Sequence, residues 1–95
     1  MALSRQALPY RWDWDNEKAW GAFEARYPLK RQTQIRKKLD EFCRHAKGDV
    51  DRIEGHPGYF RLKLPPDRVI FYVGEKSKTV WVVSVAPRGK GTYDL

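Results

Sequence analysis

Residues 59–73 read YFRLKLPPDRVIFYV, and this stretch decides the fold class. Apolar and aromatic residues flank a Pro-Pro-Asp turn, a pattern typical of two antiparallel strands joined by a tight connection. We therefore predict strands over residues 59–64 and 68–73. Three cations interrupt this strand-like segment: Arg61, Lys63 and Arg68. Charged residues belong at the surface, so these three are candidates for a functional site.

The length of the turn decides which side chains of the hairpin share a face. Alternate residues of a strand point to the same side, so a two-residue loop of Pro65 and Pro66 places Lys63 opposite Arg68 and gathers all three cations. A three-residue loop would place Arg68 opposite Leu64 on the core side, where an unpaired guanidinium is costly. We predict the first register, with a bound anion offsetting the repulsion between like charges. The alternatives are an ion pair of Arg68 with Asp67 and an ordinary solvated strand face.

Two helices are predicted before the hairpin. The first covers about residues 16–27 and carries aromatic residues at i, i+3 and i+7, namely Trp20, Phe23 and Tyr27. Pro28 ends it. The second covers about residues 30–46, with one apolar stripe formed by Ile35, Leu39, Phe42, Cys43 and Ala46.

Three further strands complete the predicted sheet. Residues 10–14 (YRWDW) alternate aromatic and charged side chains, and residues 50–54 are a short strand candidate. Residues 79–86 (TVWVVSVA) are apolar on both faces, which is expected of a strand inside the sheet.

This order of elements predicts an α+β fold. We expect the N-terminal strand and a two-helix hairpin on one face of a mostly antiparallel sheet of four or five strands, with the helices packed as an antiparallel pair. Residues 1–95 are long enough for a single domain and too short for two. The opposite face of the sheet has no helix to cover it and is therefore available for binding.

Composition narrows the class of partner. Nineteen Lys and Arg against twelve Asp and Glu give a net charge of +7, which favours an anionic partner such as nucleic acid. Cys43 is the only cysteine, so an internal disulfide is excluded and a buried thiol is expected. We found no apolar leader and no run of membrane-spanning length, which predicts a cytoplasmic protein without a membrane partner.

The last segment, PRGKGTYDL (residues 87–95), adds Arg88, Lys90 and Tyr93 to the predicted cationic face. Arginine presents a planar fork that suits phosphate oxygens. Fixed cations with one phenol, and without a metal-ligand cluster or carboxylate pair, suit the stabilisation of a phosphoryl transition state. An ordinary basic tail and a packing role for the tyrosine are the alternatives. The run at 36–38 (RKK) is a solvated helix face or a guide for a polyanion.

With these residues in view, the sequence resembles the RelE branch of the RelE/ParE toxin superfamily. The resemblance is clearest over residues 53–93, IEGHPGYFRLKLPPDRVIFYVGEKSKTVWVVSVAPRGKGTY. It implies a RelE-like fold and a bacterial toxin of a type II toxin–antitoxin system, acting as a ribosome-dependent mRNA endoribonuclease without metal or cofactor. The catalytic residues implied are Arg61, Lys63, Arg68, Arg88 and Tyr93.

The reaction implied is attack of a ribose 2′-hydroxyl on its own 3′-phosphate. Like charge around Lys63 should lower the pKa of its ammonium and make it a candidate general base. Additional RNA contacts are predicted for Lys37, Lys38 and Lys90. The expected partners are mRNA on the ribosome and a cognate antitoxin, with the chain as a monomer or in a hetero-oligomer. The rival functions are a ParE-like inhibitor of DNA gyrase and a non-catalytic nucleic-acid-binding module.

Overall fold

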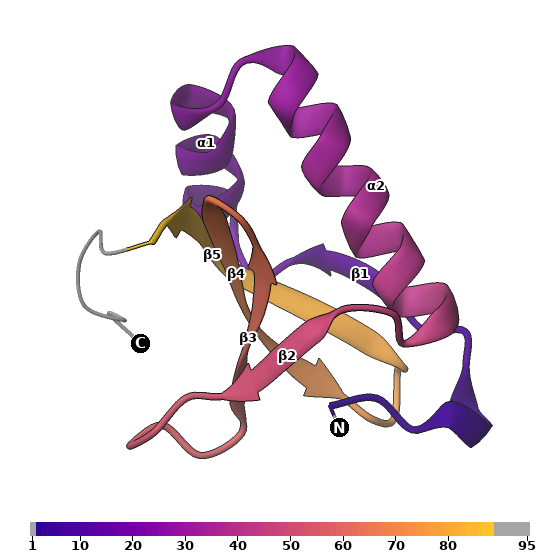
Figure 1. Ribbon diagram of the computed structural model, residues 1–95. Coiled ribbons are helices and arrows are strands. Elements are labelled where there is room, and N and C mark those ends of the chain that lie inside the picture. The colour runs from indigo at the N-terminus through magenta and orange to yellow at the C-terminus, as the bar shows by residue number, and fades with distance from the viewer. Residues whose placement is uncertain (1, 89–95) are drawn as a thin grey trace.

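The computed structural model describes residues 2–88. After a short 3-10 turn the chain forms two helices and five strands (Figure 1). The elements are η1 (Arg5–Ala7), β1 (Arg11–Trp14), α1 (Glu17–Arg26), α2 (Leu29–His45), β2 (Asp49–Arg52), β3 (Tyr59–Leu64), β4 (Asp67–Gly74) and β5 (Thr79–Pro87). Neither helix is long and apolar enough to cross a bilayer.

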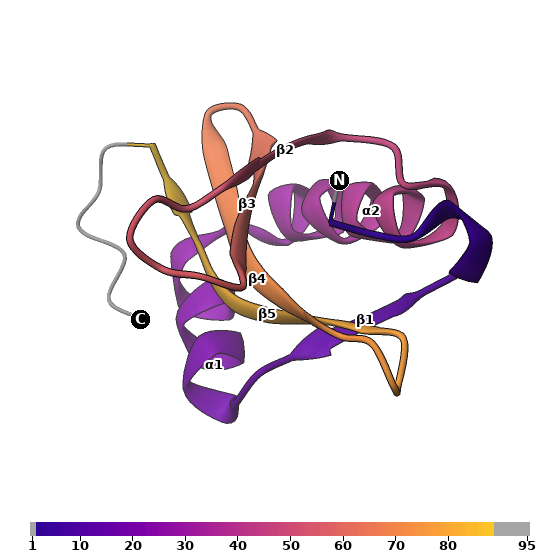
Figure 2. The ribbon, with the colours of Figure 1, turned by 90° about the horizontal axis from the view of Figure 1, so that it is seen from below.

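The strands form one sheet in the order β1-β5-β4-β3-β2. β1 pairs with β5 in parallel, and the other neighbours pair antiparallel. Both helices contribute their apolar residues to the same side of this sheet (Figure 2). The predicted α+β class is therefore confirmed, as is the interior position of the last strand, which lies between β1 and β4.

The register of the β3–β4 hairpin is the predicted one. Lys63 pairs with Arg68 and Leu64 pairs with Asp67, so only two residues form the loop. An irregularity between Ile70 and Phe71 shifts the pairing of β4 with β5 by one residue. Despite this shift, Val69 and Phe71 of β4 both face the helices and are fully buried.

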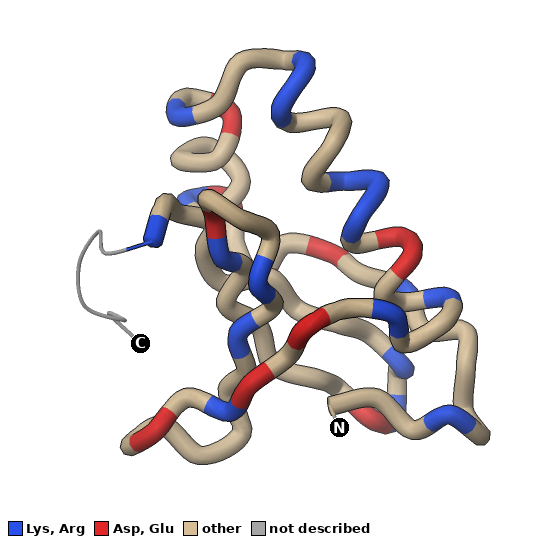
Figure 3. The backbone as a smooth tube through the Cα atoms, in the orientation of Figure 1, with Lys and Arg blue, Asp and Glu red and all other residues tan. Residues whose placement is uncertain are grey.

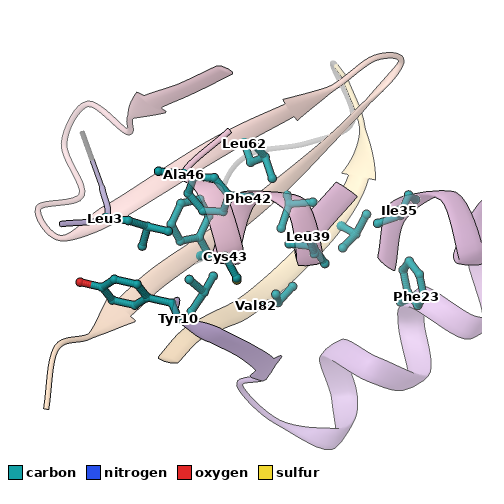
Figure 4. Close-up of a cluster of buried hydrophobic side chains, with 14 of the residues drawn as sticks. Leu3, Tyr10, Phe23, Ile35, Leu39, Phe42, Cys43, Ala46, Leu62 and Val82 are labelled. Carbon is teal, nitrogen blue, oxygen red and sulfur yellow. The ribbon is translucent and has the colours of Figure 1, made fainter. Parts of the chain in front are cut away.

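The core lies between the two helices and the sheet, with α2 contributing most of the helical residues (Figure 4). The whole predicted stripe of α2 is buried, and Cys43 lies in it with a pKa that burial raises to about 12. In α1 the prediction is wrong for Trp20, which is 43% exposed. Ala19 takes the buried position one turn before Phe23, because residues at i and i+4 lie on the same helix face.

The two helices diverge from their junction instead of packing side by side along their length (Figure 2). Near the junction the side-chain amide of Gln32 donates to the carbonyl oxygen of Tyr27 at 2.8 Å. Further along, the Arg36 guanidinium lies 5.6 Å from the ring centre of Phe23 and 5.7 Å from that of Trp12. Each helix therefore packs mainly on the sheet, and the expected antiparallel pair is limited to the ends that meet.

A buried ion pair attaches the hairpin to the helices. Asp67 opens β4, is 3% exposed, and accepts from both Nε and Nη2 of Arg31, at 3.0 and 2.8 Å. The hydroxyl of Tyr27 donates to its other oxygen at 2.7 Å, and burial together with this bond raises the pKa of Tyr27. Arg31 also donates to the carbonyl of Leu64 at 2.9 Å. These contacts hold the loop end of the hairpin, from which the cations project to the other face.

Candidate functional site

The candidate site lies on the face of β3, β4 and β5 that no helix of residues 2–88 covers, called the helix-free face below. Neighbouring residues pair across these strands in rows, so the face can be followed from one end to the other. At the hairpin end the row is Lys63, Arg68 and Ala86, and the next row is Arg61, Ile70 and Ser84. At the far end Tyr59, Tyr72 and Trp81 form an aromatic row.

Three of the predicted catalytic residues lie together in the first two rows. Lys63 and Arg68 are direct cross-strand partners, and Arg61 is two positions before Lys63 on the same face of β3. Arg61, Lys63 and Arg68 are all half-buried. The register predicted from the cost of burying Arg68 therefore places the three cations close together on one face. The interpretation of Arg68 as a simple partner of Asp67 is wrong, because Asp67 points to the helix side and pairs with Arg31.

Arg88 joins the same end of the sheet. It follows β5 directly, its side chain is exposed, and its backbone N–H donates to the carbonyl oxygen of Pro66 at 2.9 Å. It also lies two residues beyond Ala86, the cross-strand partner of Arg68. The predicted residues Lys90 and Tyr93 lie outside the described residues.

Two acidic residues of β2, which the sequence alone did not single out, face the cations of β3. Asp51 Oδ2 is 3.2 Å from Nη2 of Arg61 and 3.0 Å from Nζ of Lys63. Asp49 Oδ2 is 3.9 Å from the same ammonium. Hydrogen bonds from Lys63 and then Arg61 lower the pKa of the Asp51 carboxyl. In Figure 3 the acidic positions of β2 run beside the basic positions of β3.

These carboxylates correct the expected charge balance. The strand pattern predicts that a bound anion offsets the repulsion between the cations, whereas the protein supplies part of the counter-charge itself. The premise that only like charges surround Lys63 is therefore wrong. The signal was present in DVDR, where Asp49 and Asp51 alternate as Arg61 and Lys63 do, but using it requires the register Asp51↔Arg61.

The lysines predicted to contact RNA from the second helix do not lie on this face. Lys37 and Lys38 are exposed on α2, which covers the opposite side of the sheet. Lys38 nevertheless lines a hollow of about 290 Å³ that Lys63 also lines, at the edge between α2 and the end of β3. Lys38 is thus the closer of the two to the patch, and an RNA contact remains a prediction for both.

The aromatic row extends the site along the strands. The rings of Tyr59 and Tyr72 meet edge to face with centres 5.7 Å apart. The Tyr72 hydroxyl donates to Oδ1 of Asp15 at 2.6 Å, and this bond followed by burial raises the pKa of Tyr72 to about 12. The helix-free face therefore has cations at one end and half-buried aromatic side chains at the other, a combination found on proteins that bind single-stranded nucleic acid.

Several solved structures have a similar arrangement of elements. The RelE–RelB complex of Pyrococcus horikoshii has a chain that is 27% identical, with a TM-score of 0.59 over 88% of this chain and 100% of that chain. A mutant of the E. coli toxin RelE in the free state gives a TM-score of 0.69 at 23% identity, over 86% of each chain. The chain has a RelE-like fold.

The RelE-like chain also matches the toxin–antitoxin complex RelBE2 of Mycobacterium tuberculosis, with a TM-score of 0.68 at 17% identity over 92% of this chain and 100% of that one. No protein-family model and no curated protein matches the sequence. The support for the RelE resemblance therefore comes from solved structures. Several of them are complexes of a RelE chain with its antitoxin.

Proposed function

We propose that this RelE-like chain is the toxin of a type II toxin–antitoxin pair and cleaves mRNA on the ribosome. The observation that carries the proposal is the grouping of Arg61, Lys63, Arg68 and Arg88 at one end of a helix-free sheet face. A phosphodiester placed there would meet cations from β3, β4 and the segment after β5. Fixed positive charge of this kind stabilises a phosphoryl transition state with little reorganisation.

The proposed reaction is the one that the resemblance to RelE toxins implies. The ribose 2′-oxygen attacks the adjacent phosphorus, the bond from phosphorus to the 5′-oxygen breaks, and the products are a 2′,3′-cyclic phosphate and a free 5′-hydroxyl. One proton leaves the 2′-hydroxyl and one reaches the 5′-oxygen. Arg61 and Arg68 keep their protons and stabilise the phosphoryl oxygens, because a guanidinium does not act as a base in proteins.

The proton-transfer roles go to the remaining groups. Lys63 is the candidate base that takes the proton of the 2′-hydroxyl, and solvent water supplies the proton that reaches the 5′-oxygen. Arg88 keeps its proton and stabilises the charge on that leaving oxygen from the end of β5. Tyr93 is proposed to orient the nucleotide or to share the base role. A site with several cations contributes through each contact, and loss of one such donor typically costs about 3 kcal/mol of transition-state stabilisation, or about 100-fold in rate.

The aromatic row supports single-stranded RNA as the substrate. Tyr59 and Trp81 are half-buried on the face that carries the cations, so part of each ring is accessible. Stacking of a base on an aromatic side chain contributes about 1–3 kcal/mol and tolerates any base. Such a surface suits a single-stranded RNA whose phosphates contact the cations and whose bases stack on the aromatic rings.

The ribosome and an antitoxin complete the proposed system. Within residues 2–88 the patch offers fixed charge and no side chain placed to bend an RNA chain, so we infer that the ribosome positions the 2′-hydroxyl in line with the scissile bond. An antitoxin partner is supported by the solved relatives that are complexes with RelB chains. Its segment would need acidic or amphipathic character to cover this basic protein, whose net charge is +7.

Primer extension on translating ribosomes tests this function. The wild-type chain is expected to produce discrete cleavage stops, and Arg88→Ala should reduce their rate about 100-fold. Lys76→Ala, an exposed change in the β4–β5 turn far from the patch, is the matched control and should cleave like wild type. Equal cleavage by wild type and Arg88→Ala would reject the site. Intact mRNA with wild type would reject the nuclease, and a gyrase supercoiling assay would then test the ParE-like alternative.

A further inference from the structure

Asp51 contacts two members of the cationic patch, which consists of Arg61, Lys63, Arg68 and Arg88. A single oxygen, Oδ2, lies within 3.2 Å of Arg61 and 3.0 Å of Lys63. Asp51 is also the direct cross-strand partner of Arg61 in the β2–β3 pairing. One carboxylate oxygen thus bridges two cations that belong to different residues of the same strand. A phosphate oxygen bound by the same two side chains would occupy an equivalent position.

The neighbouring carboxylate differs from Asp51 in geometry although it shares its strand and face. Asp49 Oδ2 is 3.9 Å from Lys63, and its side chain is 70% exposed against 40% for Asp51. Across the hairpin, Arg68 approaches Lys63 from the β4 side, away from β2. Asp51 therefore competes for the side of the patch that faces β2.

We propose that Asp51 is an intramolecular competitor for the RNA phosphate, holding Arg61 and Lys63 until a phosphodiester displaces it. This inference rests on the proposed function, because it assumes that RNA is the ligand of the patch. The bridge is partly solvent-exposed, and ion pairs of this kind are weak enough for a polyanion to displace. The lowered pKa of Asp51 keeps the competitor ionised at neutral pH.

The competition predicts tighter RNA binding when the charge of Asp51 is removed. We expect Asp51→Asn to bind a 2′-O-methyl oligouridine, which lacks the attacking hydroxyl and cannot be cleaved, about three- to tenfold more tightly than wild type. The slope of log affinity against log salt should stay within about 0.7 of the wild-type slope, the value for one phosphate neutralised on a single strand, because both proteins bind the same phosphates once Asp51 is displaced.

Asp49→Asn is the matched control, because it makes the same change of charge on the same face of the same strand. If contact with both cations matters, this control should change the affinity by less than about twofold. Equal effects of the two variants would show that only net charge matters and would overturn the proposal. Weaker binding by Asp51→Asn would also overturn it, since Asp51 would then organise the cations for RNA.

A measurement on the wild-type protein avoids dependence on the folding of the variant. The carboxyl carbon of Asp51, followed by NMR, should titrate below the ordinary value of 3.8 in the free protein. With the oligouridine bound, the pKa should move upward as the contacts to Arg61 and Lys63 are lost. An unchanged pKa in the complex would contradict displacement.

The two proposals fail in different ways. If wild type does not cleave mRNA on ribosomes but Asp51→Asn binds the oligouridine more tightly, the nuclease function is rejected and the competitor role stands. If wild type cleaves and the affinity of Asp51→Asn equals that of wild type, the competitor role is rejected and the nuclease stands.

Discussion

The two faces of the β3–β4 hairpin have the same alternation of residues and are held by different forces. On the face toward the helices, Leu62, Val69 and Phe71 are at most 1% exposed and are stabilised by burial. On the other face, the side chains of Arg61 and Lys63 are 23% and 35% exposed and make ion pairs with β2. Burial is strong and non-directional, whereas exposed ion pairs are weak and replaceable. The comparison shows how one hairpin can supply both a rigid support and an exchangeable binding surface.

The largest effect on stability is expected on the covered face. Phe71→Ala should destabilise the protein by about 3–5 kcal/mol, because it leaves a cavity where Phe71 now packs 5.3 Å from the ring of Phe42. Urea unfolding followed by tryptophan fluorescence measures this change. A destabilisation below about 1 kcal/mol would mean that the covered face is not the main support of the hairpin.

A smaller effect is expected at the polar contact that joins the hairpin to the helices. Asp67→Ala removes the partner of Arg31 and Tyr27 from a buried position. Breaking a buried pair costs about 3–5 kcal/mol, but the Arg31 side chain is 25% exposed and keeps some access to water, so we expect about 2–3 kcal/mol. Asp13→Ala, at an exposed position of β1, is the control and should change stability by less than about 0.5 kcal/mol. Similar urea midpoints for the two variants would contradict the anchoring role of Asp67.

The smallest effect is expected on the helix-free face. Tyr72→Phe removes the hydrogen bond to Asp15 and keeps the ring, and an exposed bond of this kind contributes about 0.5–1 kcal/mol. The folded pKa of Tyr72, about 12, lies above the ordinary value of 10.0 for a tyrosine. Its contribution is therefore complete below pH 10 and is lost as pH rises toward 12. Wild type should lose more stability than Tyr72→Phe over this interval in urea unfolding at each pH. Parallel losses would show that the phenol does not titrate differently in the folded and unfolded protein.

Local periodicity was sufficient for most of the fold. Alternation in YFRLKL predicted β3 with its observed bounds, and the apolar stripe of the second helix predicted its buried residues. The register of the hairpin followed from the cost of burying Arg68, which is a property of the residue and needs no knowledge of distant contacts. The exposure of Trp20 was not predicted, because the buried face of a helix depends on the elements that cover it. Here Ala19 takes the buried position.

The candidate site could be predicted only in part for a related reason. The cations lie on one hairpin, so a short-range argument could place Arg61, Lys63 and Arg68 together. Asp51 comes from another strand, whose four residues include a single apolar side chain, Val50, and so carry no apolar alternation that would define its register. Its contact with the cations therefore could not be deduced before the pairing of β2 was known.

The elements, the hairpin register and the excess of positive charge can be read from the chain, because strand and helix periods and the cost of burying charge act over a few neighbouring residues. The counter-charges that meet this excess become known only from the packed fold: Asp67 pairs with Arg31 on the helix side, and Asp51 pairs with Arg61 and Lys63 on the helix-free side. Ion pairing depends on distances of a few ångströms between segments far apart in the chain, and those distances exist only after the sheet and the helices have packed.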